Sequence, residues 1–249
     1  MMKRCQKCNY DNYSEARFCS NCGNTFENNI SIENENVKKN IFKITLFFFS
    51  ILALILVNEF GNLEGYKNNF ILDFVFAFIV IIFFFVDFRI NVRNILPQKV
   101  VIFQIFLVIF LAIIFGLMIY YLGGFLNKEL LKKCDPNYFL IFLDSSNPIL
   151  YAYISVALFP AIFEELAFRN VFFNLLLKAT SVKATIIVTS ILFAFLHLGF
   201  ISFLLHFPIG LFLGWLRMKN NSILYGIVFH FFYNATILSI DVFHYFHIF

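Results

Sequence analysis

Long apolar runs, separated by short polar stretches, dominate the chain after about residue 40. A helix needs about 20 apolar residues to cross a hydrocarbon core of about 30 Å, and these runs reach or approach that length. The pattern therefore predicts an all-α polytopic membrane protein with about seven to eight transmembrane helices. The seven runs lie at about 41–58, 70–86, 100–122, 149–165, 185–198, 200–216 and 222–240.

Two further segments affect this topology. The stretch 138–143 (YFLIFL) is apolar but too short to cross, so we expect it to lie in the interface or to dip into the membrane. The first run follows about 40 polar residues, which is not the arrangement of a cleaved signal peptide, so we expect it to be retained as a span.

The basic residues predict an orientation, because Lys and Arg bias the loops that carry them toward the cytoplasm. We expect a multi-pass protein of the cell membrane with its N-terminus cytoplasmic and, for seven spans, its C-terminus outside. The loop 123–148 departs weakly from this pattern. The residues that carry the prediction are Lys38, Lys39, Lys43, Arg89, Arg93, Lys99, Lys178, Lys183, Arg217 and Lys219.

Composition supports the membrane class and excludes others. The chain has 249 residues, of which 61% are hydrophobic and 14% charged, and its mean hydropathy is +0.81. A soluble core could not bury so much apolar surface. The basic residues are scattered at membrane edges and form no nucleic-acid signature, so the lipid bilayer is the expected partner and no nucleic acid is.

The same patterns divide the chain into segments. Residues 28–40 are polar and rich in Asn, which is typical of a linker between a small head and a membrane body. The predicted segments are a small head at 1–27, the linker at 28–40, N-terminal transmembrane helices at 41–147, a second group of transmembrane helices at 148–240 and a tail at 241–249.

Four cysteines in the head form two Cys-x2-Cys pairs with ten residues between them: Cys5 with Cys8, and Cys19 with Cys22. This spacing suits a tetrahedral structural zinc site, and Gly23 fits the positive-φ position that such turns often need. A segment this short cannot build a core alone, so the metal would supply much of its folding free energy. Disulfides or a redox pair are the alternatives, and a cytosolic head disfavours the disulfides. The head resembles short zinc ribbons that precede many prokaryotic membrane proteins.

The run YAYISVALFPAIFEELAFRNVFF places three charged residues, Glu164, Glu165 and Arg169, inside an apolar segment. Each costs about 2.5 to 3.5 kcal/mol at the centre of a membrane helix, so we expect a compensating role. Glu165 and Arg169 are four apart and form a supporting ion pair on one helix face. Glu164 points about 100° away and needs another partner. Pro160 cannot donate a backbone hydrogen bond and would free the carbonyl of Val156.

Two later helices supply partners for Glu164. Phe193 and His197 are four apart, as are His230 and Asn234, so each pair shares a helix face. Intramembrane polar groups usually face one another or a water-filled cavity, so we expect Glu164, His197, His230 and Asn234 to converge. Packing is the alternative for each of them, and it is the expectation for the remaining histidines and for the close helix approach at two glycines. Those residues are His206, His244, His247, Gly210 and Gly214.

Taken in order, Glu-Glu-x3-Arg, Phe-x3-His and His-x3-Asn resemble the motifs of the CPBP family, the CAAX proteases and bacteriocin-processing proteins also called the ABI family. The likeness covers about residues 148–240 and includes GLFLGWLRMKNNSILYGIVFHFFYN. It implies an intramembrane glutamic endopeptidase in which Glu164 acts as general base on a water, assisted by His197. It further implies that His230 and Asn234 stabilise the oxyanion.

Three functions remain open from the sequence: this metal-independent endopeptidase, a protease whose zinc is held by Glu164, His197 and His230, and a non-catalytic bacteriocin-immunity or partner-binding protein. No His-Glu-x2-His occurs to support the second. The expected substrate is a peptide or the tail of a membrane protein, and the head could bind a protein partner. One difficulty is depth: His197 lies near the far end of its run, so meeting Glu164 would need a tilted, broken or longer fifth helix.

Overall fold

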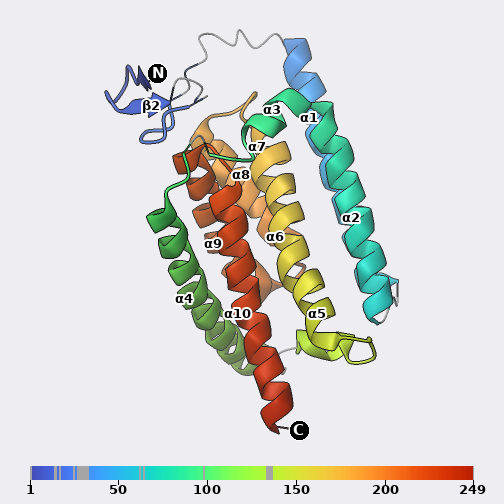
Figure 1. The fold of residues 1–249 in the computed structure, drawn as a ribbon. Coiled ribbons are helices and arrows are strands. Elements are labelled where there is room, and N and C mark those ends of the chain that lie inside the picture. Colours follow the sequence, from blue (N-terminus) through green and yellow to red (C-terminus); the bar gives the residue numbers. More distant parts are fainter. Residues whose placement is uncertain are drawn as a thin grey trace.

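The structure is a computed structural model that describes residues 2–13, 16, 18–24, 26, 34–61, 63, 65–97, 99–132 and 137–248. The predicted linker is thus described from residue 34 onward, and its residues 28–33 lie outside the described part. Helices form most of the molecule, and a small strand pair lies at the N-terminal end (Figure 1). The α-helices are α1 (Asn34–Phe60), α2 (Tyr66–Val86), α3 (Phe88–Arg93), α4 (Ile102–Leu126), α5 (Pro148–Ala152), α6 (Phe159–Glu164), α7 (Phe173–Leu176), α8 (Val182–Phe195), α9 (Phe200–Asn220) and α10 (Leu224–Ile248).

Other helix types interrupt this series. The π-helical segments are η1 (Asn127–Leu131), η3 (Tyr153–Leu158) and η4 (Glu165–Phe172), and the short apolar stretch before the fourth span forms the 3-10 helix η2 (Tyr138–Phe142). Segments α5, η3, α6, η4 and α7 follow one another without a break as one long helix, Pro148–Leu176, which we call the central helix.

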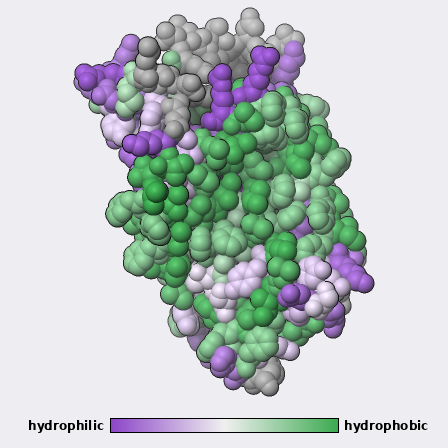
Figure 2. Space-filling model, viewed as in Figure 1, coloured by the Kyte–Doolittle hydropathy of each residue, from purple (hydrophilic) through white to green (hydrophobic). Residues whose placement is uncertain are grey.

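The membrane class predicted from the apolar runs is confirmed. Six helices in the described part of the chain are long and apolar enough to cross a membrane, and the fifth run, 185–198, forms the shorter helix α8. Figure 2 shows an apolar belt with hydrophilic residues at both ends, and the N- and C-termini lie at opposite ends of the bundle (Figure 1). The six spans are Lys38–Phe60, Tyr66–Val86, Ile102–Leu131, Pro148–Leu176, Phe200–Asn220 and Leu224–His247.

The short length of helix α8, which the sequence did not suggest, explains how His197 lies at the same depth as Glu164. It has 14 residues, so at 1.5 Å per residue it rises about 21 Å, less than the hydrocarbon thickness of about 30 Å. It begins at the head end, where the Ser181 hydroxyl accepts a hydrogen bond from the Ala184 N–H. It ends before a turn at Leu198, which has φ of 37°. His197 therefore lies at the inner tip of a short helix, and no tilted, broken or longer helix is needed.

Two apolar clusters hold the bundle around the central helix. On one side α1 and α2 pack against it, and the Phe47 ring lies 4.5 Å from the Phe172 ring, centroid to centroid. On the other side α10 packs against η3 and α6 of the central helix, and with α4 and α9 it forms a second cluster that includes Leu213, Tyr225 and Phe229. The central helix is thus supported on both faces, and this fixes the position of the charged residues that it carries.

Close approach of α8 and α9 depends on small residues, as the sequence predicts for Gly210 and Gly214. A Cβ added at Gly210 would lie 2.9 Å from the Ser190 Cβ and 3.0 Å from the Ser190 Cα, and one added at Gly214 would lie 2.9 Å from an Ile186 methyl carbon. These two glycines let α9 lie directly against α8, so their role in packing is confirmed.

We predict that Gly210→Ala destabilises the protein by about 1 to 3 kcal/mol, because the new methyl group meets the backbone of a neighbouring helix. Gly123→Ala is the matched control, since its Cβ would meet just one flexible side-chain atom, Leu205 Cδ1, at 3.4 Å. Thermal unfolding in detergent measures both variants. Equal midpoints for the two would show that the α8 and α9 contact is not tight.

Candidate functional site

The head is built from two similar turns. Strands β1 (Met2–Arg4) and β2 (Asp11–Tyr13) pair antiparallel and hold the first turn, in which the Asn9 N–H donates to the Cys5 carbonyl at 2.9 Å. In the second turn the Gly23 N–H donates to the Cys19 carbonyl at 2.8 Å. Asn9 and Gly23 both have positive φ, 55° and 72°. The left-handed backbone expected at Gly23 is therefore confirmed, and Asn9 is its counterpart in the first turn.

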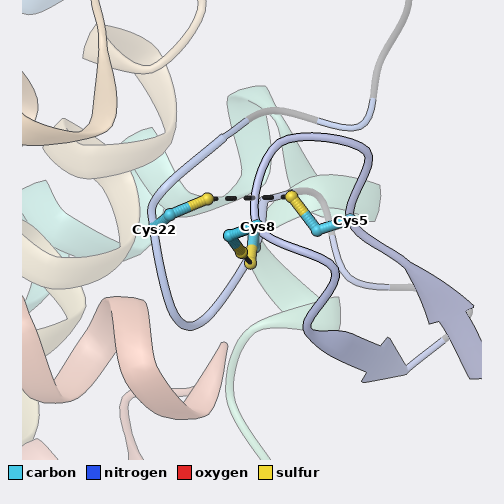
Figure 3. Close-up of side chains that lie close together, drawn as sticks. Cys5, Cys8 and Cys22 are labelled. Atoms are coloured by element: carbon cyan, nitrogen blue, oxygen red, sulfur yellow. Dashed lines mark hydrogen bonds between the residues drawn. The ribbon is translucent and has the colours of Figure 1, made fainter.

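These turns bring the four thiols together. The possible ligand atoms of Cys5, Cys8, Cys19 and Cys22 all lie within 4.8 Å of one another. The Cys5 and Cys22 sulfurs face each other at 3.7 Å (Figure 3), and those of Cys8 and Cys19 are 3.5 Å apart. Four sulfurs at 2.3 Å from a tetrahedral zinc would be about 3.8 Å apart, so the spacing fits a metal and is far too long for a disulfide of about 2.05 Å.

Local hydrogen bonds prepare the thiols unequally. Burial raises the pKa of the Cys19 thiol, but the backbone N–H groups of Cys22 and Asn21 and the side chain of Asn12 outweigh it and lower this pKa to about 6. Burial raises the pKa of the Cys22 thiol to about 12. Because a metal binds thiolates, binding at neutral pH must displace protons from the head.

In the membrane bundle, Glu165 and Arg169 form the ion pair that their spacing predicts. Arg169 Nη1 lies 3.2 Å from Glu165 Oε1, and the two side chains are 1% and 0% exposed. The Arg169 guanidinium also lies over the Phe193 ring at 4.3 Å. Gly226 faces the pair from α10, where a Cβ would lie 2.6 Å from Glu165 Oε2. Both charges are therefore buried against each other and held on every side by packing.

Glu164 has a different environment. Its side chain is 22% exposed, and its Oε2 atom accepts no hydrogen bond from the described residues. His230 lies between the two glutamates: its Nε2 is 3.8 Å from Glu164 Oε2, and its Nδ1 is 3.3 Å from Glu165 Oε1. Glu165 of the buried pair thus contacts Nδ1 of the imidazole ring, while Nε2 faces Glu164.

Asn234 joins the central helix to α10. Its side-chain N–H donates to the Val156 carbonyl at 3.0 Å. The sequence predicts that this carbonyl is freed by Pro160, one turn later, and the side chain of Asn234 is the donor that takes it. An amide nitrogen carries two N–H groups, so this contact uses one of them.

His197 and His206 form a stacked pair. Their ring centroids are 3.9 Å apart with an angle of 22° between the planes. His197 Nδ1 lies 2.8 Å from the Phe193 carbonyl, and His206 Nδ1 lies 2.7 Å from the Ser202 carbonyl. A carbonyl only accepts, so Nδ1 carries the proton in each neutral ring and Nε2 is the acceptor.

One cavity of about 320 Å³ connects these groups. Glu164, His197, His230 and Asn234 all line it, so the structure brings together the four residues that the sequence selects. The lining continues to Asp241 near the end of the bundle opposite the head, where Asp241 Oδ2 accepts a hydrogen bond from the Tyr138 N–H at 3.0 Å. The cavity thus runs from mid-depth toward that end.

Two polar residues near the site were missed from the sequence. His206 was assigned to packing, yet it lines the cavity and stacks on His197. Asp73 on α2 accepts a hydrogen bond of 2.6 Å from the Ser155 hydroxyl on the central helix. The signal that could have found both is the rule already applied to Glu164, that an ionisable residue inside a membrane helix usually has a role.

Comparison with known proteins agrees with the resemblance. Residues 146–236 match the family model described as Type II CAAX prenyl endopeptidase Rce1-like. This segment contains the central helix, α8, α9 and the part of α10 that carries His230 and Asn234. No curated protein and no solved structure matches the chain.

We predict that the purified protein carries one metal ion per chain and that Cys8→Ser removes most of it. Cys134→Ser, at the chain's fifth cysteine, is the matched control. Elemental analysis gives the stoichiometry and the identity of the metal. Retention should fall as the pH is lowered, because protons compete for the thiolates. Full metal content in Cys8→Ser would contradict a four-thiolate site.

We also predict that Arg169→Met destabilises the protein by about 3 to 5 kcal/mol, since it leaves the Glu165 carboxylate buried without its cation. Adding Glu165→Gln should recover much of this loss, because no unpaired charge then remains. Unfolding of the two single variants and the double variant in detergent measures the coupling. Additive losses would show that the two charges do not depend on each other.

Proposed function

We propose that this chain, whose residues 146–236 match the family model of Rce1-like CAAX prenyl endopeptidases, is an intramembrane endopeptidase that cleaves its substrate with a water activated by Glu164. The observation that carries the proposal is the position of Glu164: its carboxylate lines a cavity at mid-depth, beside His230, within the matched segment.

Glu164 suits the role of general base. Its neighbour Glu165 is fully buried in the pair with Arg169, so it has no access to a substrate, whereas Glu164 faces the cavity. A carboxylate with few hydrogen-bond partners is a good proton acceptor for a water that attacks a peptide carbonyl. The two adjacent glutamates thus have separate tasks, since one supports the helix and the other faces the substrate.

His197 is the second group proposed to act on the water. Its Nδ1–H is held by the Phe193 carbonyl, so the Nε2 lone pair is the part of the ring that remains to accept a proton. This ring lines the same cavity as Glu164. The proton that Glu164 takes from the water would pass through this nitrogen to the leaving amine, and breaking of the C–N bond would then complete the cleavage.

His230 and Asn234 are proposed to bind the developing oxyanion. In its imidazolium form, His230 would carry an N–H on both ring nitrogens, Nδ1 toward Glu165 and Nε2 on the cavity side, where it also faces Glu164. Asn234 has a second N–H beyond the one given to Val156. Donors fixed in this way before the reaction are worth about 2.7 to 4 kcal/mol each in other enzymes.

The ligand geometry favours a mechanism without a metal in the membrane. Among the residues that the structure describes, the four cysteines are the one group of three or more possible ligands that lie within 4.8 Å of one another. Glu164, His197 and His230 do not meet that condition. We therefore assign the metal, as structural zinc, to the head alone.

The proposed orientation has the head in the cytoplasm. The loops at the head end carry most of the basic residues, among them Arg89, Arg93, Lys178 and Lys183, and the head thiols are free. A peptide or a membrane-protein segment would then reach Glu164 from the opposite end, through the part of the cavity near Asp241.

The experiment is cleavage of a peptide library by the full-length protein in detergent. Glu164→Gln should lower kcat by about 100-fold or more, because the amide cannot take a proton from water. Glu59→Gln at the exposed end of α1 is the matched control and should keep full activity. Cleavage by Glu164→Gln at the wild-type kcat would contradict the proposal.

Whether the membrane site needs a metal is tested in a variant whose head no longer binds one. Cys8→Ser is compared with and without a chelator, since its head site is already broken. If chelation removes the remaining activity, a zinc in the membrane site replaces the proposed mechanism. If wild type cleaves nothing in the library, the non-catalytic immunity or partner-binding function gains support.

A further inference from the structure

The head is not a separate module but packs on the membrane core at the helices that carry the site. Phe18, which lies between the two cysteine pairs, is 0% exposed and contacts Phe173, Leu177 and Val182. Gly23, beside the last cysteine, lies so close to α8 that a Cβ would be 3.4 Å from the Val182 Cβ. A change in the head therefore reaches the end of the central helix and the start of α8.

Arg217 on α9 lies next to the contact between Phe18 and Phe173. Its side chain is fully buried, and its guanidinium carbon lies 5.7 Å from the Phe18 ring centroid and 5.2 Å from that of Phe173. Its Nε donates to the Arg169 carbonyl at 2.9 Å, and its Nη2 donates to Asn174 Oδ1 at 3.4 Å. One side chain thus contacts an aromatic ring of the head and three residues of the central helix, Arg169, Phe173 and Asn174.

From Arg169 a series of charged contacts leads to the cavity. The Arg169 side chain pairs with Glu165 at 3.2 Å, Glu165 faces His230 at 3.3 Å, and His230 faces Glu164 at 3.8 Å. Each member is buried or half-buried, so the groups cannot move independently without breaking a polar contact in a low dielectric. A shift of the Arg169 backbone would therefore change where Glu165 and His230 lie.

Buried asparagines fix the same turn from its other side. Asn174 donates to Asn91 Oδ1 at 2.9 Å and to Asn170 Oδ1 at 2.6 Å, and it accepts from Asn94 at 3.1 Å. The Asn174 oxygen that accepts from Asn94 is the one that Arg217 reaches. Arg217 thus completes a polar layer at the head end of the central helix.

We infer that Arg217 is a positioning residue for the site: it joins the metal-loaded head to the turn at Arg169 and so holds Glu165, His230 and Glu164 in their working arrangement. The inference rests on the proposed endopeptidase function. It assigns the head a task that the sequence left open, the support of the site through Phe18 and Arg217. Arg suits this task better than Lys, because its planar fork stacks on a ring while it donates in two directions.

The test compares Arg217→Met with Arg93→Met, a matched loss of an exposed arginine at the same end of the bundle. The full-length protein with its metal is assayed for peptide cleavage. Arg217→Met should lower kcat by about tenfold to 100-fold with little change in KM, because displaced catalytic groups slow the reaction without removing substrate contacts. Arg217→Lys should restore part of the rate, and Arg93→Met should match wild type.

The role of the head is tested by a double-mutant cycle. Cys8→Ser should lower kcat in the wild-type background, and it should lower kcat much less when Arg217 is already Met, because both changes break one connection. Phe18→Leu removes the ring but keeps an apolar side chain, so it should show a smaller loss of the same kind. Multiplicative losses in the cycle would overturn the connection, even with each single effect present.

A second measurement does not depend on cleavage. The chain has five histidines, so carbon-13 labelling at histidine Cε1 gives five assignable signals. Arg217→Met should move the His230 signal, and Arg93→Met should not. If wild type cleaves nothing, the endopeptidase proposal fails while this spectrum still tests the connection. An unmoved His230 signal in Arg217→Met, or in Arg217→Lys and Phe18→Leu if the methionine variant does not fold, would overturn the inference.

Discussion

The constraint on which the structure depends is the burial of a carboxylate and a guanidinium inside a membrane bundle. Glu165 and Arg169 are shielded from solvent and lipid, and an unpaired charge at that depth would cost several kcal/mol. Their surroundings are fitted to them: Gly226 leaves room for Glu165, and the Phe193 ring lies against the guanidinium. The helix that carries both residues changes to π-helical spacing here, a form that is rare elsewhere and common at functional sites.

This pair also explains how two adjacent glutamates come to differ. Once Glu165 is fixed toward Arg169 and α10, the preceding residue, Glu164, must face another way, and there the bundle leaves a cavity. His230 contacts both carboxylates, so the buried pair holds the ring that faces Glu164. The imidazole of His230 thus links the buried ion pair, which stabilises the bundle, to Glu164, which faces the cavity.

The sequence predicts a large part of this arrangement. The apolar runs predict the helices, the cysteine spacing predicts the cluster, and the polar residues inside the later spans predict which side chains meet. The rest depends on contacts between residues far apart in the chain. Helix α8 ends at Phe195, before the turn at Leu198 with its positive φ, and apolar periodicity does not record that end. His206 reads as a packed residue until its ring is seen against His197.

The contact between the N-terminal head and the membrane core is also one that the sequence does not predict. Composition separates the head from the membrane core, because one is polar and the other apolar. Phe18 crosses that division, since a head too small to form a core uses the membrane helices as the other half of its core. A structural metal in such a head would stabilise more than the head itself, because Phe18, the buried aromatic residue of the described part of the head, lies against helices of the site. The head and the membrane core therefore stabilise each other. Arg217 joins them, because it contacts the Phe18 ring of the head and donates to the Arg169 carbonyl of the central helix.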